Sequence, residues 1–326
     1  MGRTRCFEIV VFVVLGFLGS ALGDLQLGFY AQSCPKAEQI VLDYVTKHVP
    51  NAPNLAAAFL RMHFHDCFVR GCDGSVLLND TTSTSAEKSA PPNLSLRGFD
   101  FIDRVKSLIE AECPGVVSCA DILSLVARDA VVNRGGPFWQ VPTGRRDGTI
   151  SKASEALRNI PSPASNFTTL QARFASKGLK VKDLVLLSGG HTIGVAICSS
   201  FTNRLYNFTG KGDQDPSLDS DYAANLKANK CKTIRDNTTV VEMDPGSFKT
   251  FDLSYYTLLV KRRGLFSSDA ALITDSTSRS FINQLLQDKL SNFFADFATS
   301  MEKMGNVGVK TRTRGEIRKQ CAFVNS

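Results

Sequence analysis

Apolar side chains recur at every third or fourth position through most of this 326-residue chain. Such spacing places them on one face of an α-helix, whereas a half-buried strand alternates apolar and polar residues. The segments with helical spacing are Ala37–His48, Ala56–Phe68, Gly98–Glu112, Ala120–Arg128, Leu170–Lys177, Lys182–Leu187, Ile193–Leu205, Asp252–Arg262, Arg279–Lys289 and Asn292–Met304. Strand-like alternation is limited to short pieces near Trp139–Val141 and the C-terminus. The pattern therefore predicts an all-α protein with minor short β segments.

The segments between the predicted helices are rich in proline, serine and glycine, which favour loops. The most pronounced are Thr81–Pro92, Asn159–Asn166 and Gly210–Asp219. The sequence shows no internal repeat and no low-complexity linker. A chain of this length is near the size at which one hydrophobic core divides into two lobes.

The first 23 residues have the pattern of a secretory signal peptide. Arg3 and Arg5 precede an apolar run from Ile9 to Leu18, and small residues follow as far as Gly23. This run is much shorter than the roughly 20 apolar residues that span a bilayer. We therefore expect residues 1–23 to be removed, residues 24–326 to form the mature protein, and the protein to be secreted without a membrane anchor.

The cysteine content is consistent with secretion. The chain has nine cysteines, and Cys6 lies in the predicted signal peptide, which leaves an even number. An even number is expected where disulfides form in an oxidising compartment. Because eight cysteines allow about a hundred connectivities, their pairing is not determined by the count.

The formal net charge is +7. A basic secreted protein can be attracted to an anionic cell-wall polysaccharide. Nucleic-acid binding is disfavoured because no basic run is interleaved with aromatic residues. Diffuse surface charge without a specific partner is the simpler interpretation.

The most informative chemistry lies in residues 61–75. Arg61 and His65 are four positions apart, so on a helix they share one face, with Cβ atoms about 5–6 Å apart. A neutral imidazole can accept a proton from a small acid, and a guanidinium that stays protonated can then stabilise the departing anion. Nearby Phe64 and Phe68 indicate a mostly buried helix, which disfavours a surface helix with incidental polar residues.

Residues 61–75 resemble the distal haem helix of the secretory plant haem peroxidases (class III, the horseradish peroxidase type). Further family-like motifs occur in the right order along nearly the whole chain: Ser33–Pro35, Val117–Asp121, Gly144–Asp147, Leu187–Gly194, Asp244–Asp252 and Cys321–Ser326. The resemblance implies two helical lobes that sandwich a haem. The distal lobe would span roughly residues 24–150 plus part of the C-terminal region, and the proximal lobe roughly 151–300.

The resemblance also implies a function. It implies a monomeric, secreted enzyme of the cell wall or apoplast, with one haem b and two calcium ions. Such an enzyme uses hydrogen peroxide to oxidise small phenolic donors in successive one-electron steps, through a ferryl porphyrin-radical intermediate. Oxidation of lignin precursors or other cell-wall phenols, or defence-related oxidation, would be its role.

On the proximal side, the resemblance makes His191 the axial ligand of the haem iron. Asp269 matches the carboxylate that accepts the other ring N–H of this ligand, which favours ferric over ferrous iron. Taken without the surrounding motifs, His191 would be a capping or packing residue, and Asp269 would be a helix N-cap.

On the distal side, the resemblance makes Arg61 and His65 catalytic. Asn93 matches the residue that orients His65, and Glu87 matches the next member of the same hydrogen-bonded chain. Phe64 stands where intracellular relatives have tryptophan and would lie against the haem. His48 and His63 are interpreted as structural.

Two further assignments compete with simpler explanations. Pro161 matches the residue whose carbonyl contacts aromatic donors at the haem edge, although a proline is also ordinary in a loop. Asn93 also begins a glycosylation sequon, and a buried amide cannot carry a glycan, so we predict the hydrogen bond instead. Other sequons, which would make the protein a glycoprotein, begin at Asn79, Asn166, Asn207 and Asn237.

Two oxygen-rich groups match the family's calcium sites. Calcium takes six to eight hard oxygen ligands from side chains and carbonyls. The first group is Asp66, Val69, Gly71, Asp73 and Ser75, and the second is Thr192, Asp244, Ser247, Thr250 and Asp252. Considered alone, either cluster of aspartates would be a solvated turn.

The resemblance implies four disulfides: Cys34–Cys113, Cys67–Cys72, Cys119–Cys321 and Cys198–Cys231. Two other functions are possible. One is a non-catalytic secreted calcium-binding glycoprotein that keeps the fold, which the presence of all the expected site residues disfavours. The other is a zinc hydrolase that uses His63 and His65, whose i,i+2 spacing places them on different helix faces.

Overall fold

The computed structural model describes residues 25–326, so the predicted signal peptide lies outside the described residues. These residues form thirteen α-helices and two short strands. The helices are α1 (Ala37–His48), α2 (Asn54–Val69), α3 (Phe99–Glu112), α4 (Cys119–Asn133), α5 (Ala153–Asn159), α6 (Phe167–Ala175), α7 (Val181–Ser188), α8 (Thr202–Tyr206), α9 (Ser220–Asn229), α10 (Ser254–Val260), α11 (Ser267–Ala271), α12 (Ser276–Gln287) and α13 (Leu290–Gly305). The strands are β1 (Val195–Ile197) and β2 (Val240–Glu242). Within residues 25–326, no helix combines the length and apolar character needed to cross a membrane.

The predicted all-α class is confirmed, but the helix predicted over Ile193–Leu205 is formed only at its C-terminal end, which belongs to α8. The first part of that segment forms β1, which pairs antiparallel with β2 so that Ala196 lies opposite Val241. Branched apolar residues suit a strand as well as a helix, and the distant partner decides between them. The strand predicted near Trp139–Val141 is also not formed; the neighbouring chain makes only an isolated bridge between Thr143 and Gln26.

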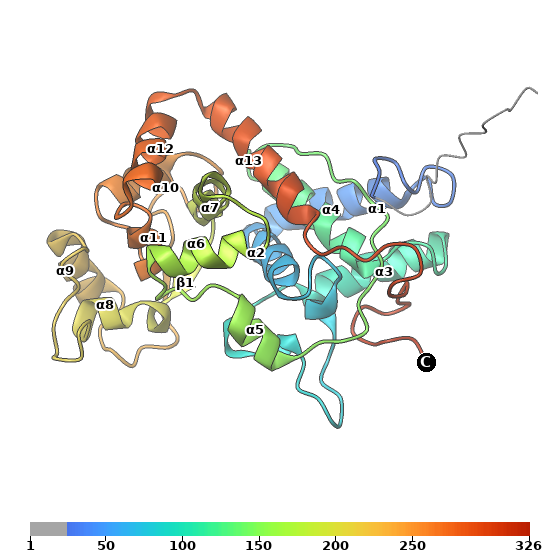
Figure 1. Ribbon diagram of the computed structural model, residues 1–326, viewed down its shortest axis with the longest axis horizontal. Coiled ribbons are helices and arrows are strands. Elements are labelled where there is room, and N and C mark those ends of the chain that lie inside the picture. The colour runs from blue at the N-terminus through green and yellow to red at the C-terminus, as the bar shows by residue number, and fades with distance from the viewer. Residues whose placement is uncertain (1–24) are drawn as a thin grey trace, which may run out of the picture.

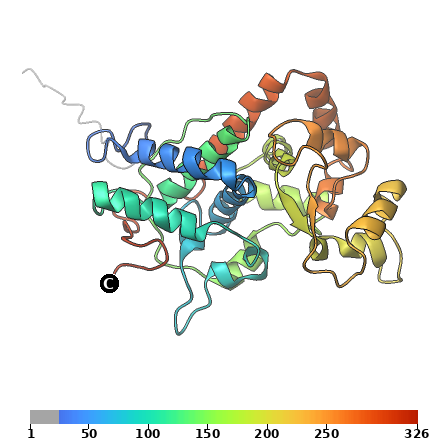
Figure 2. The ribbon, with the colours of Figure 1, turned by 180° about the vertical axis from the view of Figure 1, so that it is seen from behind.

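The helices form two groups, with α2 between them (Figures 1 and 2). Helices α1, α3 and α4 lie on one side, and α7 to α12 lie on the other. Helix α4 is buried along nearly its whole length, and it begins where Ser118 Oγ accepts a hydrogen bond from Asp121 N at 3.1 Å. Helix α2 packs against α4, so the predicted chemistry of residues 61–75 lies at the centre of the molecule.

Helix α13 returns the chain to the first group of helices (Figure 1). Just after this helix, Val307 O accepts a hydrogen bond from Cys72 N at 2.9 Å. Gly71 has φ +96°, and a Cβ on it would lie 2.5 Å from Gly308 O. Only glycine suits this position, because it combines a left-handed backbone with close contact to another chain segment. The loop after α2 is thus held against the end of α13.

Four disulfides join Cys34–Cys113, Cys67–Cys72, Cys119–Cys321 and Cys198–Cys231, the same pairs that the resemblance implies. The Cys119–Cys321 bond spans 202 residues of sequence. In the chain-entropy model, closing such a loop stabilises the fold by about 5 kcal/mol.

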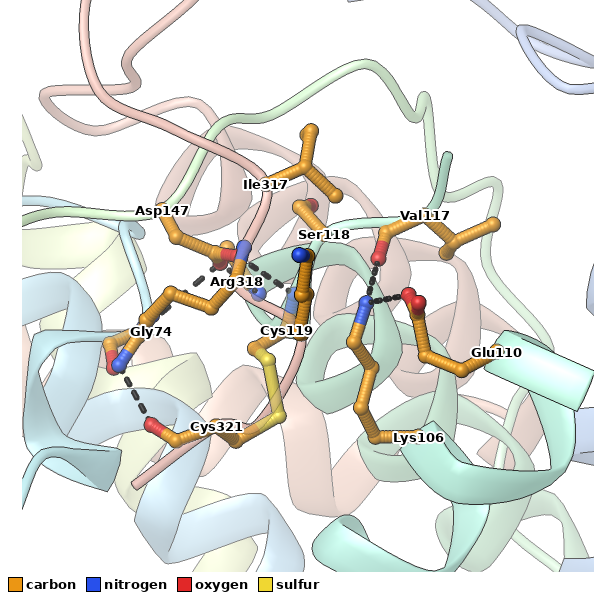
Figure 3. Close-up of a disulfide and its surroundings, with 12 residues drawn as sticks. Gly74, Lys106, Glu110, Val117, Ser118, Cys119, Asp147, Ile317, Arg318 and Cys321 are labelled. Carbon is orange, nitrogen blue, oxygen red and sulfur yellow. Dashed lines mark hydrogen bonds and ion pairs between the residues drawn. A yellow bond between two sulfur atoms is a disulfide. The ribbon is translucent and has the colours of Figure 1, made fainter. Parts of the chain in front are cut away.

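The Cys119–Cys321 disulfide lies within a buried polar network (Figure 3). The Arg318 guanidinium donates to Cys321 O and to Gly74 O, both at 2.6 Å. Asp147 Oδ2 accepts from Cys119 N at 3.1 Å and from Arg318 N at 2.9 Å. The C-terminal segment is therefore tied both to the start of α4 and to the loop that follows α2.

Candidate functional site

His65 projects from α2 and is fixed in one tautomer. Its Nδ1 lies 2.5 Å from Asn93 Oδ1, and Asn93 Nδ2 donates to Glu87 O at 2.7 Å. The second bond orients the amide, so its oxygen faces the imidazole. Because an amide oxygen only accepts, His65 Nδ1 carries the proton and donates it, which leaves Nε2 with a free lone pair. The side chain of Asn93 is buried and its nitrogen is engaged, so this sequon is not available to a glycan.

The surroundings of His65 keep its imidazole neutral. Burial lowers the pKa of His65 to about 3, and the positive charge of Arg61 contributes in the same direction, while the hydrogen bond to Asn93 opposes them. A cation in this position would lose hydration and face another cation. His65 can therefore accept a proton at neutral pH.

Arg61 lies one turn before His65 on α2. Its Nη1 donates to Ser95 Oγ at 2.9 Å, and its Nη2 donates to Pro92 O at 2.7 Å. Burial and the charge of Arg97 lower the pKa of Arg61 to about 10, which still leaves the guanidinium charged at neutral pH. The sequence did not indicate the contacts of Pro92 and Ser95, because neither residue type marks an arginine anchor.

Glu87 is connected to the distal group through its backbone carbonyl, not through its carboxylate. Burial, with the charge of Asp66 as the next contribution, raises the pKa of the Glu87 carboxyl to about 9. Ser75 lies close enough to lower this pKa, yet neither carboxyl oxygen makes a hydrogen bond of ordinary geometry within the described residues. Glu87 is thus a neutral buried acid beside the first oxygen-rich group.

His191 lies in a 3₁₀ turn, Gly189–Thr192, that follows α7. Its Nδ1 lies 2.8 Å from Asp269 Oδ1, in the first turn of α11, while Asp269 Oδ2 accepts from Phe266 N at 2.9 Å. The carboxylate accepts, so Nδ1 carries the proton. Burial alone would raise the pKa of Asp269, but the charge and hydrogen bonds of its neighbours, His191 first, leave it lowered.

The other ring nitrogen of His191 is free to bind a metal. Within the described residues, Nε2 makes no hydrogen bond, and the side chain is 40% exposed although Asp269 is buried. An imidazole whose Nδ1–H is held by a carboxylate and whose Nε2 faces open space has the usual arrangement of a metal ligand. This geometry fits the axial ligand of a haem iron.

Helix α2 connects the two histidine-containing segments. A Cβ on Gly190, next to His191, would lie 3.0 Å from Leu60 Cδ2, next to Arg61. A Cβ on Gly194 would lie 2.6 Å from Ala57 Cβ. A side chain at Gly194 would therefore push the chain that follows His191 away from α2, whereas one at Gly190 would require Leu60 to shift.

The first oxygen-rich group forms a tight loop after α2. Asp66 Oδ2 accepts from Gly74 N at 2.9 Å, and Asp73 N donates to Gly71 O at 2.7 Å. Ser75 Oγ is buried without a hydrogen bond in the described residues, and the one charged partner of the buried Asp73 Oδ2 there is the ammonium of Lys310. Burial and the charge of Asp73 raise the pKa of Asp66 to about 8.

These features fit a cation in the loop. Two buried carboxylates and an unpartnered hydroxyl oxygen are stabilised by a hard cation. The ammonium of Lys310 already lies 2.8 Å from Asp73 Oδ2, so positive charge is favoured there. A Cβ on Gly148 would clash with the same oxygen, so glycine at this position leaves room for the buried carboxylate. Val69, whose carbonyl is another predicted calcium ligand, is the C-terminal residue of α2.

The second oxygen-rich group surrounds Thr192, directly after His191. Thr192 Oγ1 donates to Asp252 Oδ1 at 3.1 Å and lies 3.5 Å from Asp244 Oδ2. Ser247 Oγ donates to Asp252 Oδ2 at 2.6 Å. Thr250 is joined to this group through its backbone, because its N–H donates to Ser247 O at 2.8 Å. Burial, together with the charge of Asp252, raises the pKa of Asp244 to about 6.

Neither group is a cluster of three or more His, Cys, Asp or Glu side chains, and residues 25–326 contain no such cluster. This composition does not suit zinc but is compatible with calcium, which also takes hydroxyl and carbonyl oxygens. The zinc hypothesis fails on orientation as well, because His63 faces Cys67 Sγ at 3.7 Å whereas His65 faces Asn93.

Two more residues were predicted to belong to the site, Phe64 and Pro161. The ring of Phe64 is half-buried and contacts the rings of His65 and Phe68, with centroids 5.6 and 4.2 Å apart. Pro161 is half-buried in the loop between α5 and α6. The same loop reaches the start of α11, where Pro163 O accepts from Ser268 N at 2.9 Å.

Comparisons with known proteins agree with this arrangement. A sequence profile of the family described as Peroxidase matches residues 41–288. Peroxidase 3 of Arabidopsis thaliana is 64% identical over 317 residues, which cover 97% of this chain and 97% of that protein. Peroxidase 39 of Arabidopsis thaliana is 61% identical over 326 residues, and Peroxidase 1 of Oryza sativa subsp. japonica is 55% identical over 329 residues; each match covers both chains completely.

Proposed function

The chain belongs to the peroxidase family and is a haem peroxidase that uses hydrogen peroxide, and on this premise we propose which of its residues perform the reaction. One observation carries the proposal: two histidines have Nδ1 engaged and Nε2 free, but their partners differ. His65 faces a neutral amide, which leaves it a neutral proton acceptor. His191 faces a carboxylate, which makes it a more strongly donating metal ligand.

Haem b would be held through its iron by His191 Nε2, with Phe64 against it on the distal side. When bound, it supplies the redox chemistry by which peroxide is reduced and a phenolic donor is oxidised. The fit rests on the free Nε2, the carboxylate behind it and the exposed imidazole. Asp269 and Asn93 each hold a histidine in the tautomer that its role requires.

His65 accepts a proton from hydrogen peroxide at Nε2 and returns it to the oxygen that leaves as water. Asn93 keeps the proton on Nδ1, so the ring does not turn or change tautomer during this transfer. Arg61 uses two of its N–H groups on Ser95 and Pro92, and its remaining donors are available to stabilise the negative charge on the departing oxygen.

Two calcium ions would complete the structure. The first would bind Asp66, Val69, Gly71, Asp73 and Ser75, and it would fix the end of the helix that carries His65. The second would bind Thr192, Asp244, Ser247, Thr250 and Asp252, and it would fix the residue that follows His191. The unpartnered, buried Ser75 Oγ supports the first site. Carboxyl pKa values raised by burial and by a neighbouring carboxylate, for Asp66 and for Asp244, support one site each.

The donors would be small phenols that meet the Pro161 carbonyl at the haem edge, and the protein would act as a secreted monomer outside the cell. Four disulfides support secretion, because such bonds persist in oxidising compartments. Two helical lobes, divided near residue 150, would enclose the haem. Attraction to anionic wall polysaccharide would follow from the net positive charge.

The deciding experiment is to purify the protein with haem supplied and record its spectrum and its peroxide-dependent oxidation of guaiacol. We expect a Soret band and activity, both lost in His191→Ala. A folded protein that binds calcium but neither takes up haem nor oxidises guaiacol would instead be the non-catalytic calcium-binding protein.

A further inference from the structure

Asp269 has a third partner that the proposed reaction does not use. The hydroxyl of Tyr255, on α10, donates to Asp269 Oδ1 at 2.9 Å. The same oxygen accepts the Nδ1–H of His191 at 2.8 Å, while Oδ2 is engaged by a backbone N–H. The tyrosine and the histidine therefore compete for the electron density of a single carboxylate oxygen.

Both the tyrosine and the carboxylate are shielded from solvent. Tyr255 and Asp269 each have only 1% of their surface exposed. The low dielectric of a buried network strengthens each hydrogen bond, and neighbouring hydrogen bonds polarise one another. The loss of one donor is not compensated by solvent. Burial and the charge of Asp269 raise the pKa of Tyr255 well above its usual value, so the hydroxyl remains a donor.

We propose that Tyr255 is a positioning residue that tunes the proximal ligand through Asp269. Its hydroxyl withdraws negative charge from Oδ1 and so weakens the pull of Asp269 on the His191 N–H. Without the hydroxyl, the imidazole would be more anionic and would favour ferric over ferrous iron. This inference rests on the proposed role of His191 as axial ligand.

The structure allows the hydroxyl to be removed alone. The ring of Tyr255 meets the ring of His191 edge to face, with centroids 5.7 Å apart and an interplanar angle of 84°. Tyr255→Phe keeps this ring and its packing. Any effect on His191 can then be assigned to the lost hydrogen bond.

The neighbouring residue provides a matched control. Tyr256 is also buried, and its ring contacts that of Tyr255 at 5.2 Å. Its hydroxyl donates to the carbonyl of Val185 at 3.0 Å and has no bond to Asp269. Tyr256→Phe removes a buried tyrosine hydroxyl from the same helix without altering the carboxylate.

The test is to measure the Fe(III)/Fe(II) midpoint potential and the iron–histidine stretching frequency of the holoenzyme. For Tyr255→Phe we expect the reduction equilibrium constant to fall by up to tenfold, equivalent to about 59 mV for one electron, and the stretching frequency to rise. Tyr256→Phe should match the parent in both. An unchanged or more positive potential in Tyr255→Phe, or an equal shift in Tyr256→Phe, would overturn the proposal.

A second variant keeps the test decisive if Tyr255→Phe does not fold. Introducing 3-fluorotyrosine at position 255 keeps the hydroxyl but makes it a stronger donor, so the potential should shift in the positive direction. A shift of the opposite sign, or no shift, would contradict the inference. If the parent holoenzyme itself shows no iron–histidine stretch, the failure lies in the assignment of His191 and not in the role of Tyr255.

Discussion

Arg61 and His65 are held by the same short segment of chain. Pro92 O and Ser95 Oγ accept from the guanidinium, and Asn93 Oδ1 accepts from the imidazole. The two side chains are already aligned by their spacing on α2. This segment therefore fixes both the proton acceptor and the cation relative to each other.

The first prediction concerns the proton acceptor. His65→Ala should slow the reaction of the enzyme with hydrogen peroxide by roughly 10²–10⁴-fold, because general-base assistance is lost. Stopped-flow measurement of the Soret change gives the rate, and a normal resting spectrum shows that haem is still bound. A rate equal to that of the parent would mean that His65 is not the base. His48→Ala, on α1, serves as the control.

The second prediction separates orientation from chemistry. Asn93→Val removes the acceptor of His65 Nδ1–H and the donor to Glu87 O, so the imidazole is free to turn or change tautomer. Losing the residue that orients a metal-bound histidine typically costs 10–100-fold, and we expect a decrease of about the same size in the peroxide rate when His65 loses its orienting partner. Ser95→Ala removes only one of two anchors of Arg61 and should have a smaller effect. An Asn93→Val enzyme as fast as Ser95→Ala would contradict the orienting role.

Much of the helical framework was predictable because its signal is local. The bounds of α1 agree with the prediction, since its apolar residues recur in register along the whole helix. The first part of the helix predicted over Ile193–Leu205 was wrong because the pairing of β1 with β2 joins segments about forty-five residues apart. Helix α5 was missed because its seven residues make only two turns, and α9 because it buries only Ala223 and Leu226 and so shows little apolar period.

From the residues themselves, the candidate site was predictable only where one motif contained its residues. The pairs of His65 with Asn93 and of His191 with Asp269 were predicted from the family resemblance. Arg61 and His65 share a helix turn, so their spacing indicates their proximity. The hydrogen bond between Tyr255 and Asp269 joins two helices across a buried contact, and nothing near Tyr255 in the sequence indicates its partner. The anchoring of Arg61 by Ser95, 34 residues away, was missed for the same reason.

The third prediction concerns calcium. Removing the ions with a chelator should lower the thermal midpoint and alter the Soret spectrum, because buried carboxylates lose their counter-charge. A ligand present at a hundred times its Kd stabilises a fold by about 2.7 kcal/mol, so loss of either ion should be measurable. Metal analysis should find two ions in the parent and one in either Asp73→Asn or Asp244→Asn. Unchanged stability after verified calcium loss, or two ions in either variant, would refute the assignment.

The fourth prediction concerns acid stability and uses His63, a buried histidine outside the reaction. Burial and the positive charge of Arg145, itself paired with Asp121 Oδ1 at 2.8 Å, lower the pKa of His63 to about 3. Between that value and the ordinary histidine pKa of about 6.5, the unfolded chain binds a proton that the native protein does not. The stability contributed by neutral His63 is therefore present above pH 6.5 and is lost as the pH falls, at about 1.4 kcal/mol per pH unit.

His63→Leu removes this proton-binding difference. In urea titrations between pH 6 and pH 4, the free energy of unfolding of the variant should fall less steeply than that of the parent, by about 1.4 kcal/mol per pH unit. The comparison depends on the slope, so a constant loss from altered packing against Cys67 does not affect it. If both proteins lose stability equally on acidification, His63 is protonated in the native state, and its burial does not hold it neutral.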